Sequence, residues 1–194
     1  ARAKNLASDW GRLIDGAAGY SAILAVVIGL AHGYPELKVT LIWLTLLTVL
    51  RAMAFDFFKQ FIKTLHREGV DWSAMELTKV REQNHSRGHW LLLIYICYLR
   101  FQRFLCLGQW ALPGGGPDSF YWTGERRSRF FQAHRQSLGC WKWNGPDVVF
   151  FALALTSLLG ILEACLGVIT LLVGLQMVHM VWLGYKGRRH ETTA

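Results

Sequence analysis

Long apolar runs dominate the pattern of hydrophobic and polar positions, and the longest extends from Val148 to Tyr185. It contains a single charged residue, Glu163. About 20 apolar residues suffice to cross a hydrocarbon core of about 30 Å, so a run of this kind indicates membrane-embedded helix. As one helix it would be about 57 Å long. Its length therefore favours a tight hairpin that turns between Gly160 and Gly167.

The periodicity of the same run favours a single helix instead. At about 100° per residue, small and weakly polar side chains gather on one face and bulky aliphatic side chains on the other. The run contains no Pro, Asn or Asp to mark a turn. We therefore expect one long helix whose end projects beyond the bilayer, and the hairpin is the alternative.

The small face of this run predicts a surface for helix packing. Small side chains let two helix backbones approach closely, which is how helices associate within a bilayer. Glu163 would be costly against lipid, so we expect a neutral, hydrogen-bonded carboxyl group there, with a proton- or ion-handling carboxylate as the alternative. The predicted packing seam consists of Ser157, Gly160, Glu163, Ala164, Gly167 and Gly174.

Two shorter apolar runs open the chain and predict a helical hairpin over residues 17–34 and 39–58, with Pro35 in its loop. The polar residues 59–88 are rich in Lys and Arg and predict a cytoplasmic segment. Residues 89–112 begin with an apolar block and then carry two arginines on one face. This segment is either a third span or an amphipathic helix in the membrane interface.

Residues 113–147 begin with three glycines between two prolines and continue as an aromatic and basic loop. Aromatic and basic side chains beside an apolar helix are typical of a membrane interface, where rings and cations lie among the headgroups. We predict interfacial positions for Arg51, Arg100, Arg103, Trp122, Trp141 and Trp143.

Composition supports the same fold class. Hydrophobic residues make up 53% of the chain and charged residues 18%, a balance shifted toward membrane proteins. The net charge of +8 could indicate nucleic acid, but the basic residues lie beside apolar segments, as membrane anchors do. We expect an all-α, polytopic helical integral membrane protein, a single membrane domain with about four membrane segments.

Charge bias predicts the orientation. Both ends and residues 59–88 are basic, so both termini should be cytoplasmic and the number of crossings even. In one arrangement residues 89–112 cross, the final run crosses once and the 113–147 loop lies outside. In the other, residues 89–112 lie flat, the final run is a hairpin and the loop stays inside, which obeys the positive-inside rule better.

One constellation could hold a metal. Glu82, His85 and His89 are three and four residues apart, which places them on one helical face within about 80°. A carboxylate and two imidazoles are suitable metal ligands. The His-x-x-x-His pair resembles the first histidine box of membrane di-iron desaturases and hydroxylases, over these residues alone. Those enzymes need further histidine clusters, whereas the remaining histidines here are scattered at His66, His134, His179 and His190.

A heme held by His32 and His179 is a second cofactor hypothesis, so the cofactor stays open. Cys97, Cys106, Cys140 and Cys165 form no C-x-x-C pair. We expect a non-enzymatic membrane subunit that contacts lipid and packs into a homo- or hetero-oligomeric assembly, such as a secretion, conjugation or energy-converting complex of an inner membrane. The alternatives are a small membrane oxidoreductase and a proton- or ion-conducting subunit that uses Glu163.

Overall fold

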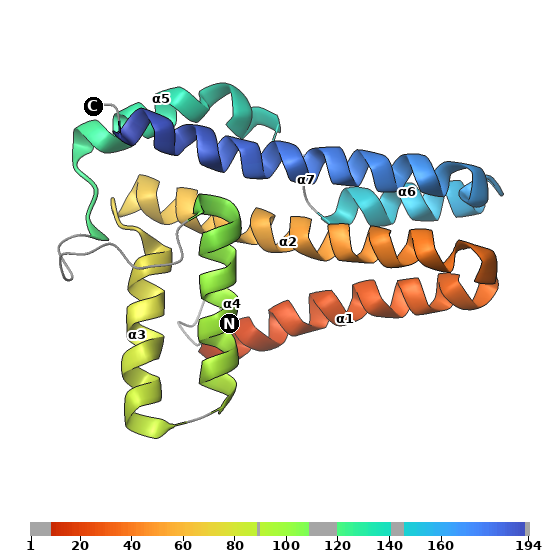
Figure 1. Ribbon diagram of the computed structural model, residues 1–194, viewed down its shortest axis with the longest axis horizontal. Helices are drawn as coiled ribbons and strands as arrows, with labels where there is room; N and C mark the ends of the chain where they lie inside the picture. The colour runs from red at the N-terminus through yellow and green to blue at the C-terminus, as the bar shows by residue number, and fades with distance from the viewer. Residues whose placement is uncertain (1–8, 89, 109–119, 141–145, 193–194) are drawn as a thin grey trace. The chain divides into compact units, whose positions relative to one another are not determined.

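The computed structural model describes residues 9–88, 90–108, 120–140 and 146–192, and over these residues the chain is helical (Figure 1). The predicted all-α class is confirmed. A single antiparallel bridge, between Val70 and Tyr121, is the one β-type pairing in the described segments. The elements are α1 (Asp9–Gly33), the 3₁₀ helix η2 (Pro35–Leu37), α2 (Lys38–Arg67), α3 (Trp72–Arg87), α4 (Trp90–Leu107), α5 (Gly124–Cys140), α6 (Pro146–Leu158) and α7 (Leu162–Thr192).

The helices form two compact units. The first unit contains Ala1–Leu50 and Val149–Gly174, and the second contains Arg51–Val148 and Leu175–Ala194. α2 and α7 each contribute residues to both units.

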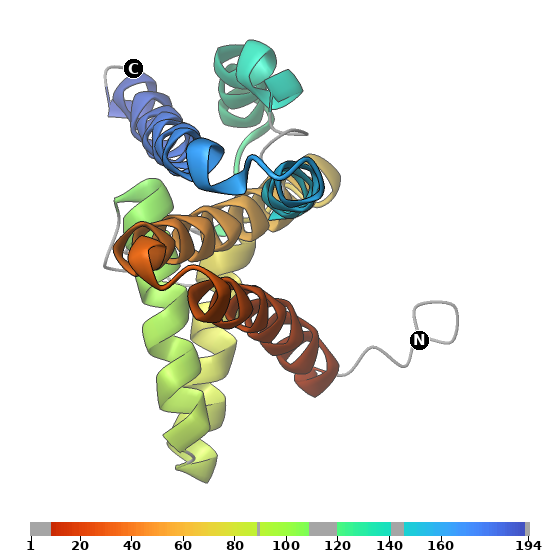
Figure 2. The same ribbon diagram turned by 90° about the vertical axis from the view of Figure 1, so that its right-hand side faces the viewer.

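The first unit is built from two helical hairpins, α1–α2 and α6–α7, whose turns lie at the same end (Figures 1 and 2). Leu, Val and Ile side chains of α2, α6 and α7 form its core, and Val27, Leu30 and Ala31 of α1 pack against them. The buried core residues are Leu41, Leu44, Val149, Leu153, Leu162, Leu166, Ile169 and Val173.

The outer surface of this unit is apolar as well. Ile28 is 68% exposed, Trp43 56% and Phe151 68%. Other large apolar side chains on these outer faces are Leu24, Val39, Ile42, Leu46, Leu155, Val168, Leu171 and Leu172. A helix that is apolar on every side belongs either in a large protein core or in a membrane.

Within the described residues, three stretches are long and apolar enough to cross a bilayer by length and composition: Pro35–Arg67, Trp90–Leu107 and Leu162–Trp182. Ala18–Gly33 and Asp147–Leu158 are apolar but shorter.

The expectation of one continuous helix over residues 148–185 is wrong. α6 ends at Leu158, α7 begins at Leu162, and Gly160 between them has a φ of 70°. The N–H of Gly160 donates to the carbonyl of Ser157 (3.1 Å), and the N–H of Ile161 donates to that of Thr156 (3.0 Å). These two bonds are a Schellman ending, in which a left-handed glycine reverses the chain and satisfies the last carbonyls of the helix.

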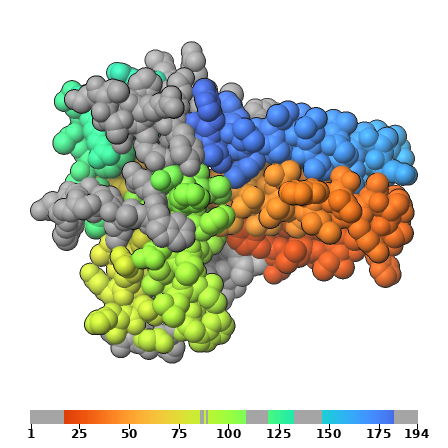
Figure 3. All heavy atoms as spheres, viewed as in Figure 1, coloured from red at the N-terminus to blue at the C-terminus, as the bar shows by residue number. Residues whose placement is uncertain are grey.

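The second unit contains a hairpin of α3 and α4, joined through Leu77 and Val80 against Ile96 and Leu99. In both ribbon views these helices run crosswise to the C-terminal part of α2, and the space-filling view shows α3 and α4 side by side (Figure 3). α3 ends at Arg87, where Gly88 is left-handed and donates its N–H to the carbonyl of Asn84 (2.8 Å).

A short strand-like pairing fixes the start of α3. The N–H of Asp71 donates to the carbonyl of Phe120 (2.8 Å), and the N–H of Trp122 donates to that of Gly69 (2.7 Å). Gly69 has a φ of 71°, and a Cβ at this position would lie 3.0 Å from Nη1 of Arg127. The positive φ therefore favours glycine here, whereas the flexible end of the Arg127 side chain could shift to make room for a Cβ.

The turn at Gly160 predicts opposite effects for two Gly→Ala variants. Gly160→Ala forces an L-residue into the left-handed region and should lower the free energy of unfolding by about 1 kcal/mol. Gly167→Ala lies within α7, where a Cβ meets nothing within 4 Å, and should raise it by about 0.5–1 kcal/mol. Thermal unfolding of both variants in detergent, followed by circular dichroism, measures the difference. Equal shifts in the same direction would contradict the turn.

Candidate functional site

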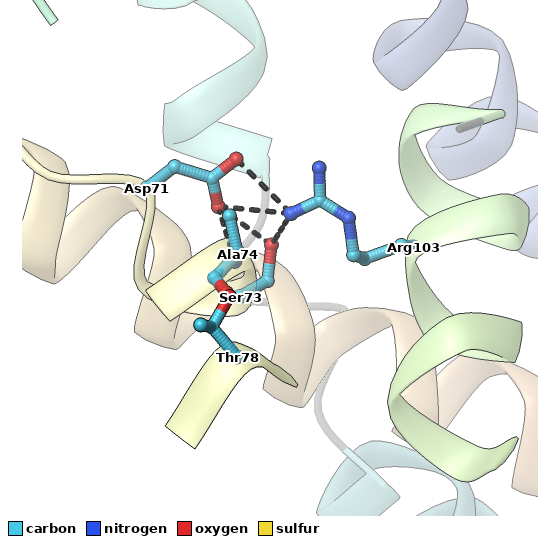
Figure 4. A network of polar contacts seen from close by, with 5 residues as sticks. All are labelled: Asp71, Ser73, Ala74, Thr78 and Arg103. Carbon is cyan, nitrogen blue, oxygen red and sulfur yellow. Dashed lines mark hydrogen bonds and ion pairs between the residues drawn. The ribbon is translucent and has the colours of Figure 1, made fainter. Parts of the chain in front are cut away.

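Three polar side chains are buried together where α3 begins, and we refer to Asp71, Ser73 and Arg103 as the Asp71 cluster (Figure 4). Nη1 of Arg103, from α4, lies 3.1 and 3.0 Å from the two carboxylate oxygens of Asp71 and also hydrogen-bonds to Ser73 Oγ. Ser73 Oγ lies 2.6 Å from Asp71 Oδ1. Arg103 and Ser73 are 0% exposed and Asp71 4%.

Asp71 has two structural roles at once. Its Oδ1 accepts the N–H of Ala74 (3.1 Å), so it caps the N-terminus of α3 while its carboxylate pairs with Arg103. Both carboxylate oxygens are therefore engaged by protein donors. The arrangement joins the C-terminal part of α4 to the start of α3, and its chemistry is that of a structural ion pair, since a charge buried here without its partner would be strongly destabilising.

A second group of buried polar side chains lies along α2 in the same unit. Arg51 is 1% exposed and hydrogen-bonds through Nη1 to Oε1 of Gln176 in α7. Nε2 of Gln102 donates to the carbonyl of Met53 (3.2 Å) and to the hydroxyl of Tyr98 (2.8 Å). These contacts join α4 and α7 to α2 through polar atoms.

The buried arginines correct part of the predicted interface. Arg51 and Arg103 were expected to extend to lipid headgroups, and the structure buries both, because Gln176 and Asp71 supply partners inside the second unit. Arg100 is half-buried on α4. Trp141 and Trp143 lie outside the described residues.

Trp122 belongs to an aromatic cluster that fastens α5 to the end of α2. Its ring packs edge-on against Phe61 (5.8 Å between centroids) and Phe130 (5.6 Å), and Phe61 and Phe130 are themselves 5.8 Å apart. The guanidinium of Arg126 lies 4.0 Å from the Trp122 ring centroid, in cation–π geometry. Trp122 therefore contributes to packing within the second unit.

The residues of the predicted metal triad do not lie on one continuous helix. Glu82 and His85 are exposed on α3, but α3 ends at Arg87 and Gly88 turns the chain, so the shared helical face stops before His89. His89 itself lies outside the described residues. Over the described part of the chain, no group of three or more His, Cys, Asp or Glu side chains could hold a metal ion.

The two histidines considered for heme are both exposed. His32 lies in the last turn of α1, and the ring of His179 lies 6.0 Å from that of Trp182 on α7.

The predicted packing seam does not form one helical face. Ser157 is on α6 and Gly160 is in the turn, so neither continues the face of α7. On α7, Gly174 faces inward, since a Cβ there would lie 3.5 Å from Leu47 Cδ1. Ala164 and Gly167 are exposed on its outer side.

Glu163 also has a different position from the one expected. It lies exposed in the first turn of α7, immediately after the hairpin turn. A carboxylate is favoured there by the helix dipole and does not have to be buried in mid-helix. The buried, mid-helix position from which the ion-handling alternative was drawn is therefore not the position that Glu163 occupies.

Sequence reasoning missed Asp71, Ser73 and Gln176, which are the partners of the buried arginines, and it missed Gln102, which bonds to Met53 and Tyr98. A signal was present for Asp71, because Asp directly before a helix is a favoured N-cap residue. No comparable signal marks the two glutamines.

Comparison of the chain with protein-family models, with curated proteins and with solved structures finds no match.

The Asp71 cluster predicts a partial rescue between two substitutions. Arg103→Met leaves the Asp71 carboxylate buried without its cation and should lower the free energy of unfolding by about 3–5 kcal/mol. Adding Asp71→Asn removes the remaining charge and keeps a good N-cap residue, so the double variant should regain part of the loss. Denaturant unfolding of the full chain in detergent gives both values, with Asp71→Asn alone as the control. Additive losses would mean that the two side chains do not act as a pair.

Proposed function

We propose that this chain is a non-enzymatic integral membrane subunit that packs into a larger membrane assembly. The observation that carries the proposal is the first unit, whose helices are apolar both in their core and on their outer surface. An outer surface of large aliphatic and aromatic side chains is stable against acyl chains and costly in water.

The proposed topology has four crossings, made by the hairpins α1–α2 and α6–α7. α2 and α7 contain 30 and 31 residues, about 45 Å each, so they are long enough to cross and to project into the cytoplasm. α6 has 13 residues, about 20 Å, and local thinning of the bilayer would accommodate it.

The distribution of charge supports an orientation with both turns outside. The turns over residues 34–38 and 159–163 lie at the same end of the first unit and contain one of the 21 Lys and Arg residues, Lys38. The other basic residues lie in the remaining segments of the chain. By the positive-inside rule, both termini and the polar segments between α2 and α6 are cytoplasmic.

Small side chains on the outer surface support the packing role. Ala164 and Gly167 of α7 are exposed, and so are Ala18, Ala22, Ala25 and Gly29 of α1, which follow one another at spacings of four, three and four. Two helices can approach closely along such faces, and van der Waals contact between backbones then drives association in lipid. The proposed partner is another membrane helix, from a second copy of this chain or from a different subunit.

Cysteine labelling tests the topology. In a variant lacking the four native cysteines, Glu36→Cys and Glu163→Cys should react with a membrane-impermeant maleimide in intact cells, because both lie at the outer turns. Lys63→Cys, near the C-terminus of α2, should react only after the membrane is opened. Labelling of Lys63→Cys in intact cells would reverse the orientation, and protection of Glu163→Cys alone would refute the second hairpin.

Bulky substitution on the small face of α7 tests assembly. Ala164→Leu with Gly167→Leu keeps the helix apolar and enlarges two exposed positions, so the variant should fold and insert. It should nevertheless run as a smaller species than the unsubstituted protein in mild detergent, because a partner helix can no longer approach. Leu172→Val, also on an exposed face, is the matched control and should assemble normally. If both variants assemble alike, the small face contacts lipid and not a partner.

A further inference from the structure

α4 has two different faces, and one of them is apolar and exposed. Ile96, Leu99, Arg103 and Cys106 are buried. On the other side an exposed row follows the helix at spacings of four, three, four and three residues. This row, here called the α4 row, consists of Trp90, Ile94, Cys97, Phe101 and Phe104.

The α4 row is exposed to an extent that needs an explanation. Trp90 is 66% exposed, Ile94 57%, Phe104 47% and Phe101 38%, and the neighbouring Leu93 is 52% exposed. An apolar strip of aromatic and aliphatic side chains that runs the length of a helix marks a surface that is covered by lipid or by a partner.

The helix packed against α4 prevents it from crossing a bilayer. α4 is long and apolar enough, with 18 residues and a mean hydropathy of 1.5. However, α3 lies beside it and exposes the charged side chains of Lys79, Arg81 and Glu82. If α4 crossed, these charges would enter the hydrocarbon core with it, which is costly for each of them.

Contacts with α2 show that α4 lies nearer than α3 to the apolar end of α2. The C-terminal part of α4 reaches α2 at Met53, through the hydrogen bond from Gln102. The segment that starts α3 pairs with residues 120–122, whose Trp122 packs on Phe61, about 12 Å further along α2. Along α2, α4 therefore lies toward the apolar end and α3 toward the charged end, where Lys59, Lys63 and Arg67 are exposed (Figure 1).

The same contacts fix the direction of α4. α3 and α4 run crosswise to the C-terminal part of α2 in both ribbon views. If α2 follows the membrane normal, α4 lies parallel to the membrane surface. Only residues 68–71 separate α2 from α3. The α4 row therefore stays close to the bilayer that α2 crosses in the proposed topology, at a high effective concentration.

We infer that α4 is an in-plane membrane helix whose row of Trp90, Ile94, Cys97, Phe101 and Phe104 binds a lipid surface at the boundary of headgroups and acyl chains. The inference rests on the proposed topology, in which α2 crosses the bilayer. Trp and Phe side chains suit this boundary, and the half-buried Arg100 next to Phe101 can extend its guanidinium to anionic headgroups. α3 then faces water with its charged side.

Cys97 lies in the middle of the α4 row and is exposed, so it is a native attachment point for a depth probe. We would attach a nitroxide to Cys97 in the full chain with Cys106→Ala, Cys140→Ser and Cys165→Ala, reconstituted into vesicles of phosphatidylcholine and phosphatidylglycerol. Collisions with oxygen should exceed collisions with a water-soluble nickel chelate, at a depth of about 5–10 Å below the phosphates. Lys79→Cys in the same background with Cys97→Ser is the control on α3 and should be accessible to nickel.

Two further labels separate the inference from its alternatives. Trp90→Cys and Phe104→Cys are about 21 Å apart along the helix, so they should report equal shallow depths if α4 lies in the plane. Depths near opposite faces would show that α4 crosses, nickel access at Cys97 would show that the row faces water, and protection from both reagents would show a protein partner. Each of these results overturns the inference. Release of the whole chain by alkaline carbonate would instead refute the proposed topology.

Discussion

The packing of α3 against α4 in the second unit depends on the carboxylate of Asp71. It caps α3, pairs with Arg103 of α4 and belongs to the residue whose backbone N–H bonds to Phe120. Three segments far apart in the sequence therefore meet at one residue. Because the pair is fully buried, its geometry has to be right for the charge to be tolerated, and this requirement fixes the register of α4 against α3.

The two units differ in the polarity of the side chains that they expose. The helices of the first unit expose apolar side chains on their outer faces as well as in their core. Which leucines face inward is therefore determined by packing between the helices and not by a contrast between polar and apolar faces. In the second unit the described side chains of α3 that are buried are Ser73, Ala74, Glu76, Leu77 and Val80, while Lys79, Arg81 and Glu82 are exposed. α4 has an apolar outer face beside a helix with exposed charged side chains, and we base on this contrast the inference that α4 lies in the membrane plane.

The apolar runs were sufficient to predict helices, because runs of this length have few alternatives to helix. They did not predict the break at Gly160. The small residues on both sides of Gly160 happen to keep the helical phase, so periodicity suggested one face where the structure has two helices. A glycine followed by Ile161 fits a Schellman ending and was the available signal, although Pro, Asn and Asp are more obvious markers of a turn.

The burial and the partners of Arg51 and Arg103 could not be predicted from the local sequence pattern. Arg103 pairs with a residue 32 positions away and Arg51 with one 125 positions away. An arginine in an apolar helix is compatible with both headgroup contact and an internal partner, and only the tertiary arrangement decides between them. The predicted metal triad required one helix through residues 82–89, and this helix ends at Arg87, before Gly88. The glycine between the predicted ligands was the signal in the sequence for this helix end.

The brevity of α6 has a consequence for biogenesis. With 13 residues it is shorter than the stretch of about 20 that crosses a hydrocarbon core, so in the proposed topology it would not enter a bilayer on its own. Its entry would have to wait until α7 has been synthesised, so that the Schellman turn can bring the two together and they partition into lipid as one body. In the proposed topology this hairpin would then insert only after α7 has been synthesised, and termination of synthesis within α7 would leave α6 outside the bilayer.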